Sequence, residues 1–161
     1  MTGGEKDKQH KRYMTGGQKF IAAAEELGSW YLDDEGRARF PYQKAPKKHA
    51  VYVFIVDNRR DRPCYVGSTH NIWERMRTYS NAKFGGSLHE DKINTAVKSK
   101  LDGGVRVNVY YLTPDPSLVP WGETGLKLSV IHGLEQGILQ MRAKPEWNKM
   151  HGSMRVKESR P

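Results

Sequence analysis

The sequence predicts an α+β fold, in which a small three-stranded antiparallel sheet is flanked by helices and preceded by a short N-terminal extension. Two observations lead to this prediction. Runs of β-branched and aromatic residues at 50–56, 64–67 and 105–111 are typical of strands. Apolar residues at helical spacing fill the segments between and after them. The expected order is therefore strand, strand, helix, helix, strand, helix, which suits a sheet with helices packed against it.

The first 48 residues are predicted to form a basic N-terminal arm. Residues 1–17 are polar and rich in glycine and lysine, a composition that is typical of a mobile segment. Residues 18–27 carry their apolar side chains on one helical face and predict a short helix. A turn-like run of acidic residues and glycine predicts a hairpin over residues 30–40.

The main domain is expected to open with a hairpin, because strand 50–56 is followed by a polar turn and by the returning strand 64–67. Asn71 is expected to cap the helix that follows, since Glu74 three residues later can complete a capping box. A glycine-containing loop then precedes a second helix, in which apolar residues recur every four positions from 93 to 101.

The C-terminal part is predicted to hold one more strand and one more helix. Residues 105–111 alternate between apolar and polar side chains, as in a half-buried strand. A proline-rich loop over residues 114–120 precedes a third helix over about residues 124–142. The main domain is thus expected to span residues 49–150, and residues 151–161 form a basic C-terminal tail.

The charge balance favours a polyanionic partner. The chain has 27 lysine and arginine residues against 18 acidic residues, a formal net charge of +9, concentrated in residues 6–12, 37–48 and 149–160. Each phosphate that a basic side chain neutralises releases condensed counterions, so such a surplus is typical of nucleic-acid binding. On charge alone, a basic protein of another kind is equally consistent with the sequence.

The sequence predicts a cytoplasmic protein that does not enter a membrane. No stretch approaches the ~20 consecutive apolar residues that a membrane-spanning helix requires. The basic N-terminus is not followed by the apolar region of a signal peptide. Cys64 is the single cysteine, which excludes a disulfide framework and a cysteine zinc site.

Two tyrosine motifs on the predicted hairpin carry the strongest functional signal. Residues 50–52 read Ala-Val-Tyr and residues 65–67 read Tyr-Val-Gly, on adjacent strands. Arg75 follows in the first turns of the capped helix, and Glu135 borders the apolar stripe of the last helix. In order, spacing and structural context, these residues resemble the GIY-YIG nuclease superfamily over roughly residues 49–150.

The resemblance has one further match and two departures. Asn148, in the run Pro-Glu-Trp-Asn, is similar to the terminal asparagine of the family. Ala50 and Val51 stand where the family usually has Gly-Ile, although the tyrosine of that motif is kept. Tyr79 stands where many members place a histidine, which leaves open how the attacking water loses its proton.

The resemblance implies a DNA endonuclease that uses one divalent metal ion, Mg²⁺ or Mn²⁺, held by Glu135 as the single protein carboxylate. Arg75 would brace the scissile phosphate with its planar guanidinium. Tyr52 and Tyr65 would orient the attacking water, and Tyr79 can reach the same pocket because it lies four residues after Arg75. A tyrosine would act as a base only if a cation such as Arg75 lowered its pKa from about 10.

Further residues are expected at the edge of this site. His89 lies where members of the family often carry another active-site histidine, and Asn148 would hold the site through side-chain hydrogen bonds or contact a phosphate. Ser68 and Thr69 either bind phosphate or cap the following helix. The candidate DNA-binding residues are Ser68, Thr69, Arg77, Lys47 and Lys48.

Three functions fit these observations. The leading hypothesis is a site-selective endonuclease of the restriction, homing or phage type, acting in the cytoplasm of a bacterial or phage-infected cell. The alternatives are a non-catalytic basic nucleic-acid-binding module and a repair or recombination nuclease that acts on branched DNA. Arg75 and Glu135 argue against the binding module, because a binder needs neither residue at these positions. A homodimer would be one way to cut both strands.

Overall fold

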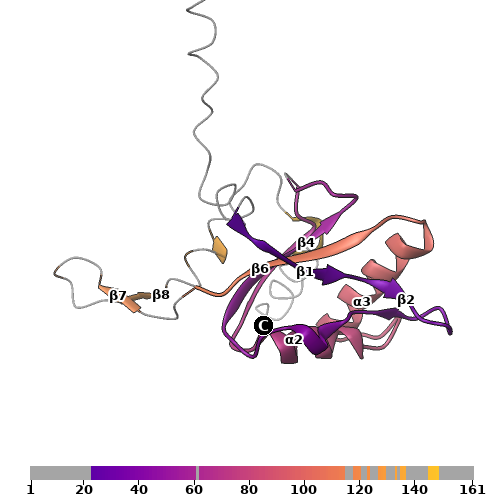
Figure 1. The fold of residues 1–161 in the computed structure, drawn as a ribbon, viewed down its shortest axis with the longest axis horizontal. Coiled ribbons are helices and arrows are strands. Elements are labelled where there is room, and N and C mark those ends of the chain that lie inside the picture. Colours follow the sequence, from indigo (N-terminus) through magenta and orange to yellow (C-terminus); the bar gives the residue numbers. More distant parts are fainter. Residues whose placement is uncertain are drawn as a thin grey trace, which may run out of the picture.

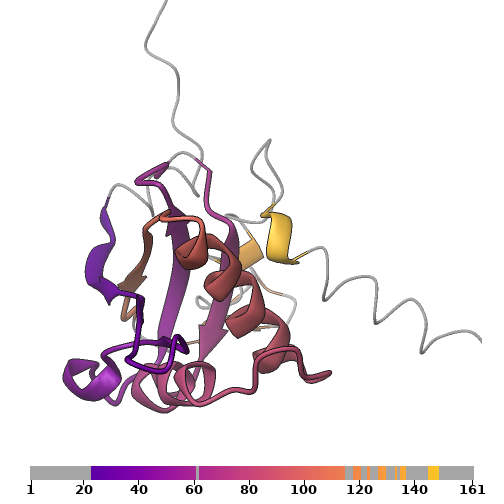
Figure 2. The same cartoon turned by 90° about the vertical axis from the view of Figure 1, so that its right-hand side faces the viewer.

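The computed structural model describes residues 23–60, 62–114, 118–120, 123, 127–129, 133, 135–136 and 145–148. The strands of its main sheet are β1 (Glu25–Ser29), β4 (Ala50–Val56), β5 (Tyr65–Thr69) and β6 (Val107–Leu112). They pair antiparallel in the order β1-β6-β4-β5. Helices α2 (Ile72–Ser80) and α3 (His89–Asp102) connect β5 to β6 and pack on one face of the sheet (Figure 1, Figure 2). The predicted α+β class is confirmed.

The main sheet has four strands where three were predicted. β1 pairs with β6, which would otherwise present an open edge of unpaired N–H and C=O groups. The helix predicted over residues 18–27 is therefore wrong at residues 25–27, which lie in β1. Residue 23 is helical, and residues 18–22 lie outside the described residues. Pairing with a distant strand outweighs a local apolar pattern that fits a helix.

The hairpin predicted over residues 30–40 is confirmed as a short two-stranded sheet of β2 (Tyr31–Leu32) and β3 (Ala38–Arg39). Its turn is fixed by Asp33, whose Oδ1 accepts two backbone N–H groups of the turn at 3.0 and 2.8 Å. A single 3-10 turn, η1 (Tyr42–Lys44), then leads to β4.

The two predicted helices after the first hairpin are confirmed. Asn71 caps α2, because its Oδ1 accepts a hydrogen bond from the backbone N–H of Glu74 at 3.1 Å. The other half of the predicted capping box is replaced by a bond from the N–H of Asn71 to Oγ1 of Thr69 at 3.2 Å. In α3, Ile93 and Val97 are fully buried against the sheet, as their spacing predicted.

The C-terminal part departs from the prediction. Residues 127–129, assigned to a helix that begins near residue 124, form strand β8 (Lys127–Ser129), which pairs with β7 (Leu118–Pro120). The proline-rich loop therefore ends in a strand. Residues 133, 135 and 136 are helical, as predicted. The rest of that helix, the arm over residues 1–17 and the tail over residues 151–161 lie outside the described residues.

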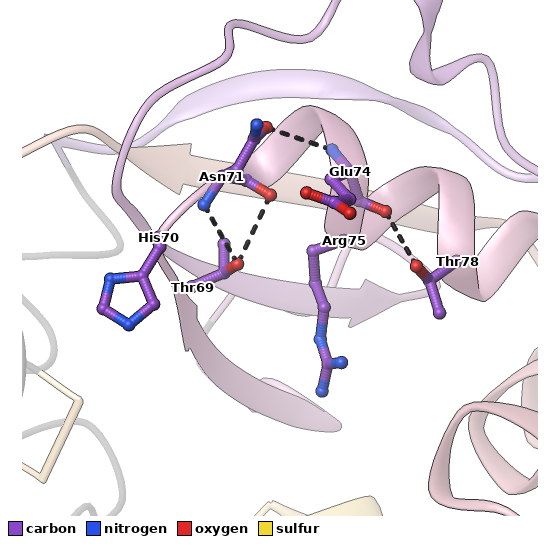
Figure 3. Close-up of a pocket in the computed structure, with 6 residues that line it drawn as sticks. All are labelled: Thr69, His70, Asn71, Glu74, Arg75 and Thr78. Atoms are coloured by element: carbon purple, nitrogen blue, oxygen red, sulfur yellow. Dashed lines mark hydrogen bonds between the residues drawn. The ribbon is translucent and has the colours of Figure 1, made fainter.

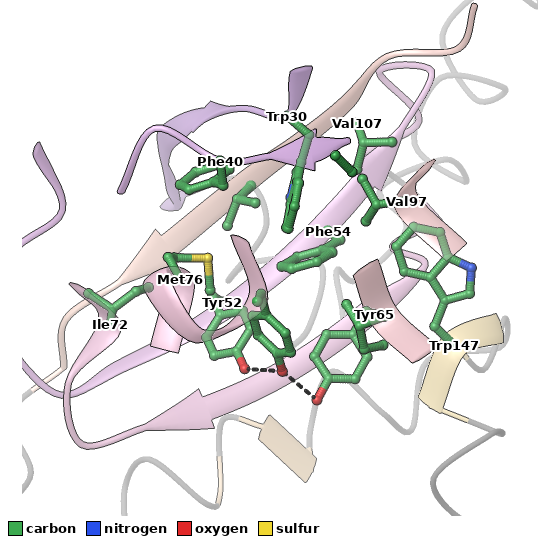
Figure 4. Packing of buried hydrophobic residues seen from close by; sticks show 14 of the residues in the cluster. Trp30, Phe40, Tyr52, Phe54, Tyr65, Ile72, Met76, Val97, Val107 and Trp147 are labelled. Carbon is green, nitrogen blue, oxygen red and sulfur yellow. Dashed lines mark hydrogen bonds between the residues drawn. The ribbon is translucent and has the colours of Figure 1, made fainter. Parts of the chain in front are cut away.

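Two apolar clusters cover the two faces of the sheet. The larger cluster lies between the sheet and the helices and is built around the aromatic rings of Trp30, Phe54 and Trp147 (Figure 4). The smaller cluster covers the other face and consists of Ala24, Val51, Val53, Ile55 and Val66. Part of the N-terminal segment thus shares the main core, and the domain boundaries at 48/49 and 150/151 stay predictions. Among the described residues, no helix is long and apolar enough to cross a membrane.

Candidate active site

Three tyrosine hydroxyl groups meet at the end of the larger cluster. Tyr52 lies on β4, Tyr65 on β5 and Tyr79 on the last turns of α2. The hydroxyl oxygen of Tyr79 lies 2.9 Å from that of Tyr52 and 3.2 Å from that of Tyr65. Figure 4 shows the hydroxyl oxygens of Tyr52 and Tyr65 at the two ends of a row joined by dashed hydrogen bonds. The bonds run from Tyr52 through Tyr79 to Tyr65.

The glycine of the second motif makes this arrangement possible. Gly67 is the β5 partner of Tyr52 in the sheet register. A Cβ atom at Gly67 would collide with the ring and hydroxyl of Tyr52. The motif therefore requires glycine for space rather than for backbone freedom, because any side chain there would displace the buried Tyr52 ring.

Arg75 and His89 end the row of tyrosines. Nε of Arg75 donates to the hydroxyl of Tyr52 at 3.4 Å, and its guanidinium carbon lies 4.8 Å from the ring centroid of Tyr79. At the other end, the hydroxyl of Tyr65 lies 3.0 Å from Nε2 of His89. Each hydroxyl donates once and accepts once when Nε2 of His89 is the final acceptor. The five side chains then form one continuous chain of hydrogen bonds.

The three tyrosines are held in their neutral form. Burial raises the pKa of Tyr52, and the nearby guanidinium of Arg75 does not offset that effect. Burial likewise raises the pKa of Tyr65 and of Tyr79. Burial acts to lower the pKa of Arg75, but its interactions with Tyr79 and Tyr52 outweigh it, so that Arg75 stays a cation. The tyrosines are therefore hydrogen-bond donors at neutral pH, and the condition for a tyrosinate base is not met.

Arg75 also has an acidic partner that was not singled out from the sequence. Oε1 of Glu90, the residue after His89, lies 3.4 Å from Nη1 of Arg75. The two side chains are 26% and 30% exposed respectively, so this ion pair faces solvent on one side. Glu90 directly follows His89 in the chain, and this position was the sequence signal that could have identified it. Arg75 is thus shared between a tyrosine inside the protein and a carboxylate at its surface.

A shallow pocket of about 270 Å³ opens beside Arg75 at the start of α2. Figure 3 shows the Arg75 side chain extending from the helix between Thr69 and Thr78. Thr69, a candidate phosphate ligand, uses its hydroxyl in the local turn, where it accepts from the N–H of Asn71 at 3.2 Å. The pocket is lined by Thr69, His70, Asn71, Glu74, Arg75 and Thr78.

Asn148 fastens the edge strand. Its Oδ1 accepts from the N–H of Val66 at 2.8 Å, and its Nδ2 donates to the carbonyl of Val66 at 2.9 Å. The preceding N–H, that of Trp147, donates to the carbonyl of Cys64 at 2.8 Å. Residues 146–148 are helical, and the bonds of Asn148 hold this turn against the outer edge of β5. Both amide atoms of Asn148 are used to hold the strand that carries Tyr65.

Glu135 also contacts β5. Its Oε2 accepts a hydrogen bond from Oγ of Ser68 at 2.5 Å. Ser68 pairs with Val51, which faces the smaller apolar cluster, so Ser68 lies on the face of the strand opposite Tyr65. The structure therefore brings Glu135 and Asn148 to the same edge strand, and the tyrosines, Arg75 and His89 to its inner face.

The candidate DNA-binding cations gather around one tryptophan. Nζ of Lys47 lies 4.8 Å from the Trp73 ring, and the guanidinium carbon of Arg77 lies 5.7 Å from it. Lys48, the residue after Lys47, is exposed, and its carbonyl accepts from the N–H of Ile72 at 3.0 Å. Lys48 thus lies at the start of α2, and Arg77 lies in its last turn. Trp73 was not singled out from the sequence, although it stands two residues before Arg75.

Comparison with known proteins gives a match in structure and none in sequence. No family model matches the chain, and no curated protein matches it. A mutant of bacteriophage T4 EndoII superposes with a TM-score of 0.57 at 18% identity, over 76% of this chain and 90% of that chain. The restriction endonuclease HPY188I in complex with product DNA matches with a TM-score of 0.45 at 13% identity, over 89% of this chain and 80% of that one. The first match shows a shared fold and is consistent with the GIY-YIG resemblance.

Proposed function

We propose that the chain is a divalent-metal-dependent DNA endonuclease of the GIY-YIG type. The observation that carries the proposal is the chain of hydrogen bonds from Arg75 through three neutral tyrosines to His89. This arrangement places a fixed cation, a row of donors and a proton acceptor within one buried group. The fold shared with T4 EndoII and the net charge of +9 support the same function.

Arg75 binds the scissile phosphate in this proposal. Its side chain is only 30% exposed, and its guanidinium is held by Tyr52 and by the Tyr79 ring, so its orientation is set before the substrate arrives. A guanidinium can donate two parallel hydrogen bonds to a phosphate. The contact to Glu90 is 3.4 Å long, and a phosphate can replace it.

The tyrosines and His89 accept the proton of the attacking water. Tyr65 carries the hydroxyl next to His89. In this proposal its oxygen accepts a hydrogen bond from the attacking water. As the water attacks phosphorus, its proton passes to the oxygen of Tyr65 while the hydroxyl proton of Tyr65 passes to Nε2 of His89. No tyrosinate accumulates, which agrees with the raised pKa of Tyr65. An imidazole is the side chain that ordinarily accepts a proton near neutral pH.

Glu135 is the residue that would hold the metal ion. Mg²⁺ and similar ions bind through one or two carboxylates, with water and substrate phosphate oxygens as the other ligands. A half-buried carboxylate oriented by Ser68 fits this mode. An ion held there would supply positive charge to a phosphate at this edge of the sheet.

The direct test is cleavage of supercoiled plasmid DNA and of a branched DNA junction by the full chain, with Mg²⁺ or with EDTA. Metal-dependent nicking of the plasmid supports a site-selective endonuclease. Cleavage of the junction alone would favour the repair or recombination type, and binding without cleavage would favour the non-catalytic module. The Glu135→Ala variant, which should not cleave, serves as the inactive control.

A further inference from the structure

The loop between α2 and α3 holds two large apolar side chains in solvent. Leu88 is 65% exposed and Phe84 is 56% exposed, the largest values among the big apolar side chains that the structure describes. Single exposed apolar residues are common on proteins, so exposure by itself indicates no partner. Two other features distinguish residues 83–88, the apolar loop: it is fixed in place, and it borders the candidate active site.

Side chains of α3 fix the apolar loop at both ends. The buried carboxylate of Asp91 accepts from the N–H of Lys83 at 2.8 Å and from the N–H of Leu88 at 3.2 Å. In the middle of the loop, Oγ1 of Thr95 accepts from the N–H of Gly85 at 2.8 Å. The loop is therefore held by charge-assisted and neutral hydrogen bonds rather than by burial of its side chains.

The two glycines of the loop serve the same purpose. Gly85 has a φ of +71°, which other residues rarely adopt. A Cβ atom at Gly86 would collide with the carboxylate of Asp91. The backbone is thus shaped to approach Asp91 closely, and the exposure of Phe84 and Leu88 follows from a defined conformation.

Leu88 also occupies a position where leucine is unfavourable for the fold. It is the N-cap of α3 and makes no side-chain capping hydrogen bond. Ser, Thr, Asp or Asn at an N-cap stabilises a helix, whereas leucine does not. A leucine here both exposes apolar surface and forgoes a cap, which points to a role outside folding.

The apolar loop leads directly into the candidate active site. His89, the next residue, contacts Tyr65, and Glu90 contacts Arg75. Leu88 therefore directly precedes the two residues that join α3 to the row of tyrosines and to Arg75.

We propose that Leu88 and Phe84 insert as apolar wedges against the base pairs that flank the phosphate held by Arg75. The proposal rests on the endonuclease function proposed above and adds how the DNA is engaged. DNA-bending proteins insert leucine or phenylalanine between base steps and kink the duplex. The exposed Lys83 supplies positive charge for the adjacent phosphates. Flexible pyrimidine–purine steps would then be favoured.

The test compares binding of the full chain to a short mixed-sequence duplex in EDTA at several salt concentrations. Leu88→Ser and Phe84→Ser should each weaken binding by about 10-fold without changing the salt dependence, because they remove an apolar contact. Lys83→Ala should instead lower the salt slope by about 1, since it removes one phosphate contact. The matched control is Leu32→Ser, a leucine that is 38% exposed on β2 and should bind like wild type.

A second measurement tests insertion itself. Closed circular plasmid is relaxed by a metal-independent topoisomerase in the presence of wild type or variant, and the topoisomers are compared. Plasmid relaxed in the presence of wild type should be unwound, and plasmid relaxed in the presence of Leu88→Ser should not. The melting temperature of the Leu88→Ser protein should equal or exceed that of wild type, because serine can cap α3. If both serine variants bind and unwind DNA like wild type, the wedge proposal is wrong. Plasmid nicking by wild type would still support the endonuclease function in that case. A wild type that does not bind DNA refutes both, and loss of a dimer in Leu88→Ser would mark the loop as a self-association surface instead.

Discussion

Nε2 of His89 lies 3.0 Å from the hydroxyl oxygen of Tyr65, and this contact joins the start of α3 to the edge strand β5. Tyr65 is 6% exposed, whereas His89 is only half-buried. A buried hydroxyl is thereby connected, through one hydrogen bond, to an imidazole that can exchange its proton with solvent.

The first prediction concerns proton transfer. His89→Ala should lower the rate of plasmid nicking by about 10²-fold or more, because general base catalysis contributes at least that much. DNA affinity should change little. His89→Gln gives Tyr65 an acceptor but cannot take up a proton, so it should be equally slow. A glutamine variant that cleaves like wild type would show that His89 only positions Tyr65.

The pH dependence of nicking separates these roles further. If neutral His89 accepts the proton, the wild-type rate rises with pH through the titration of the imidazole, and the variants lose that rise. The matched control is His70→Ala, since His70 lines the pocket and packs against His49 with ring centroids 5.1 Å apart. It should keep the wild-type profile.

The second prediction concerns the cation that Tyr52 and Glu90 share. Arg75→Lys should slow nicking by about 10²-fold with a modest change in binding, because lysine keeps the charge and loses the planar fork. Glu90→Gln should tighten DNA binding by about 2- to 5-fold at low salt, the range expected for a partly exposed ion pair. Fluorescence anisotropy with labelled duplex measures both affinities.

A control on the same helix tests whether the effect of Glu90 is local. Asp102 forms an ion pair with Lys98 at 2.6 Å near the C-terminal end of α3. Asp102→Asn removes the same charge from α3 without touching Arg75. Equal tightening by Asp102→Asn and Glu90→Gln would mean that net charge, rather than release of Arg75, strengthens binding.

The third prediction concerns the metal. Glu135→Ala should abolish cleavage and leave DNA affinity similar or higher, since a negative charge is removed. Ser68→Ala keeps the carboxylate but loses its 2.5 Å hydrogen bond, so it should raise the Mg²⁺ concentration for half-maximal rate by about 10-fold or more. Ser99→Ala, which removes a hydroxyl bonded to a helix carbonyl of α3, is the control. Full nicking by Glu135→Ala would refute the assignment to a single carboxylate.

Local sequence patterns correctly predicted those parts of the fold that depend on contacts between residues close together in the chain. The first hairpin and the cap at Asn71 follow from residues that lie close together in the chain. Residues 25–27 of β1 were predicted as helix because their partner strand, β6, is about 80 residues away and leaves no mark on the sequence of this segment. For the same reason, the helical spacing near residue 127 did not show that β8 pairs with β7.

The candidate site shows the same division. The resemblance supplied the positions of Tyr52, Tyr65 and Tyr79, but it did not show that all three hydroxyls are joined in one chain. Asn148 was expected from its position in the sequence, whereas its two bonds to Val66 depend on where the chain returns to β5. The raised pKa of each tyrosine also depends on burial, which a motif does not reveal.

The last prediction concerns the ionisation of the tyrosines. Burial raises the pKa of Tyr52, Tyr65 and Tyr79 above the ordinary value of about 10, so the folded protein favours their neutral form. When folding raises the pKa of an acidic group, its neutral form stabilises the folded state. This stabilisation is complete at pH values below the pKa of the unfolded chain, and it is lost as the pH rises toward the pKa of the folded chain. Stability should therefore fall above about pH 10.

Near-ultraviolet absorbance of tyrosinate measures this directly. All eight tyrosines should ionise near pH 10 in denaturant, whereas the folded chain should hold a group of them back until it unfolds. Tyr79→Phe removes the central hydroxyl and keeps the ring, so it should reduce the delayed group by one and slow nicking while the fold persists. Tyr31→Phe, at a tyrosine that is 49% exposed, should reduce only the early group. Ionisation of every tyrosine at its ordinary pKa in the folded chain would show that the three hydroxyls are open to solvent and that the proton path through Tyr65 is wrong.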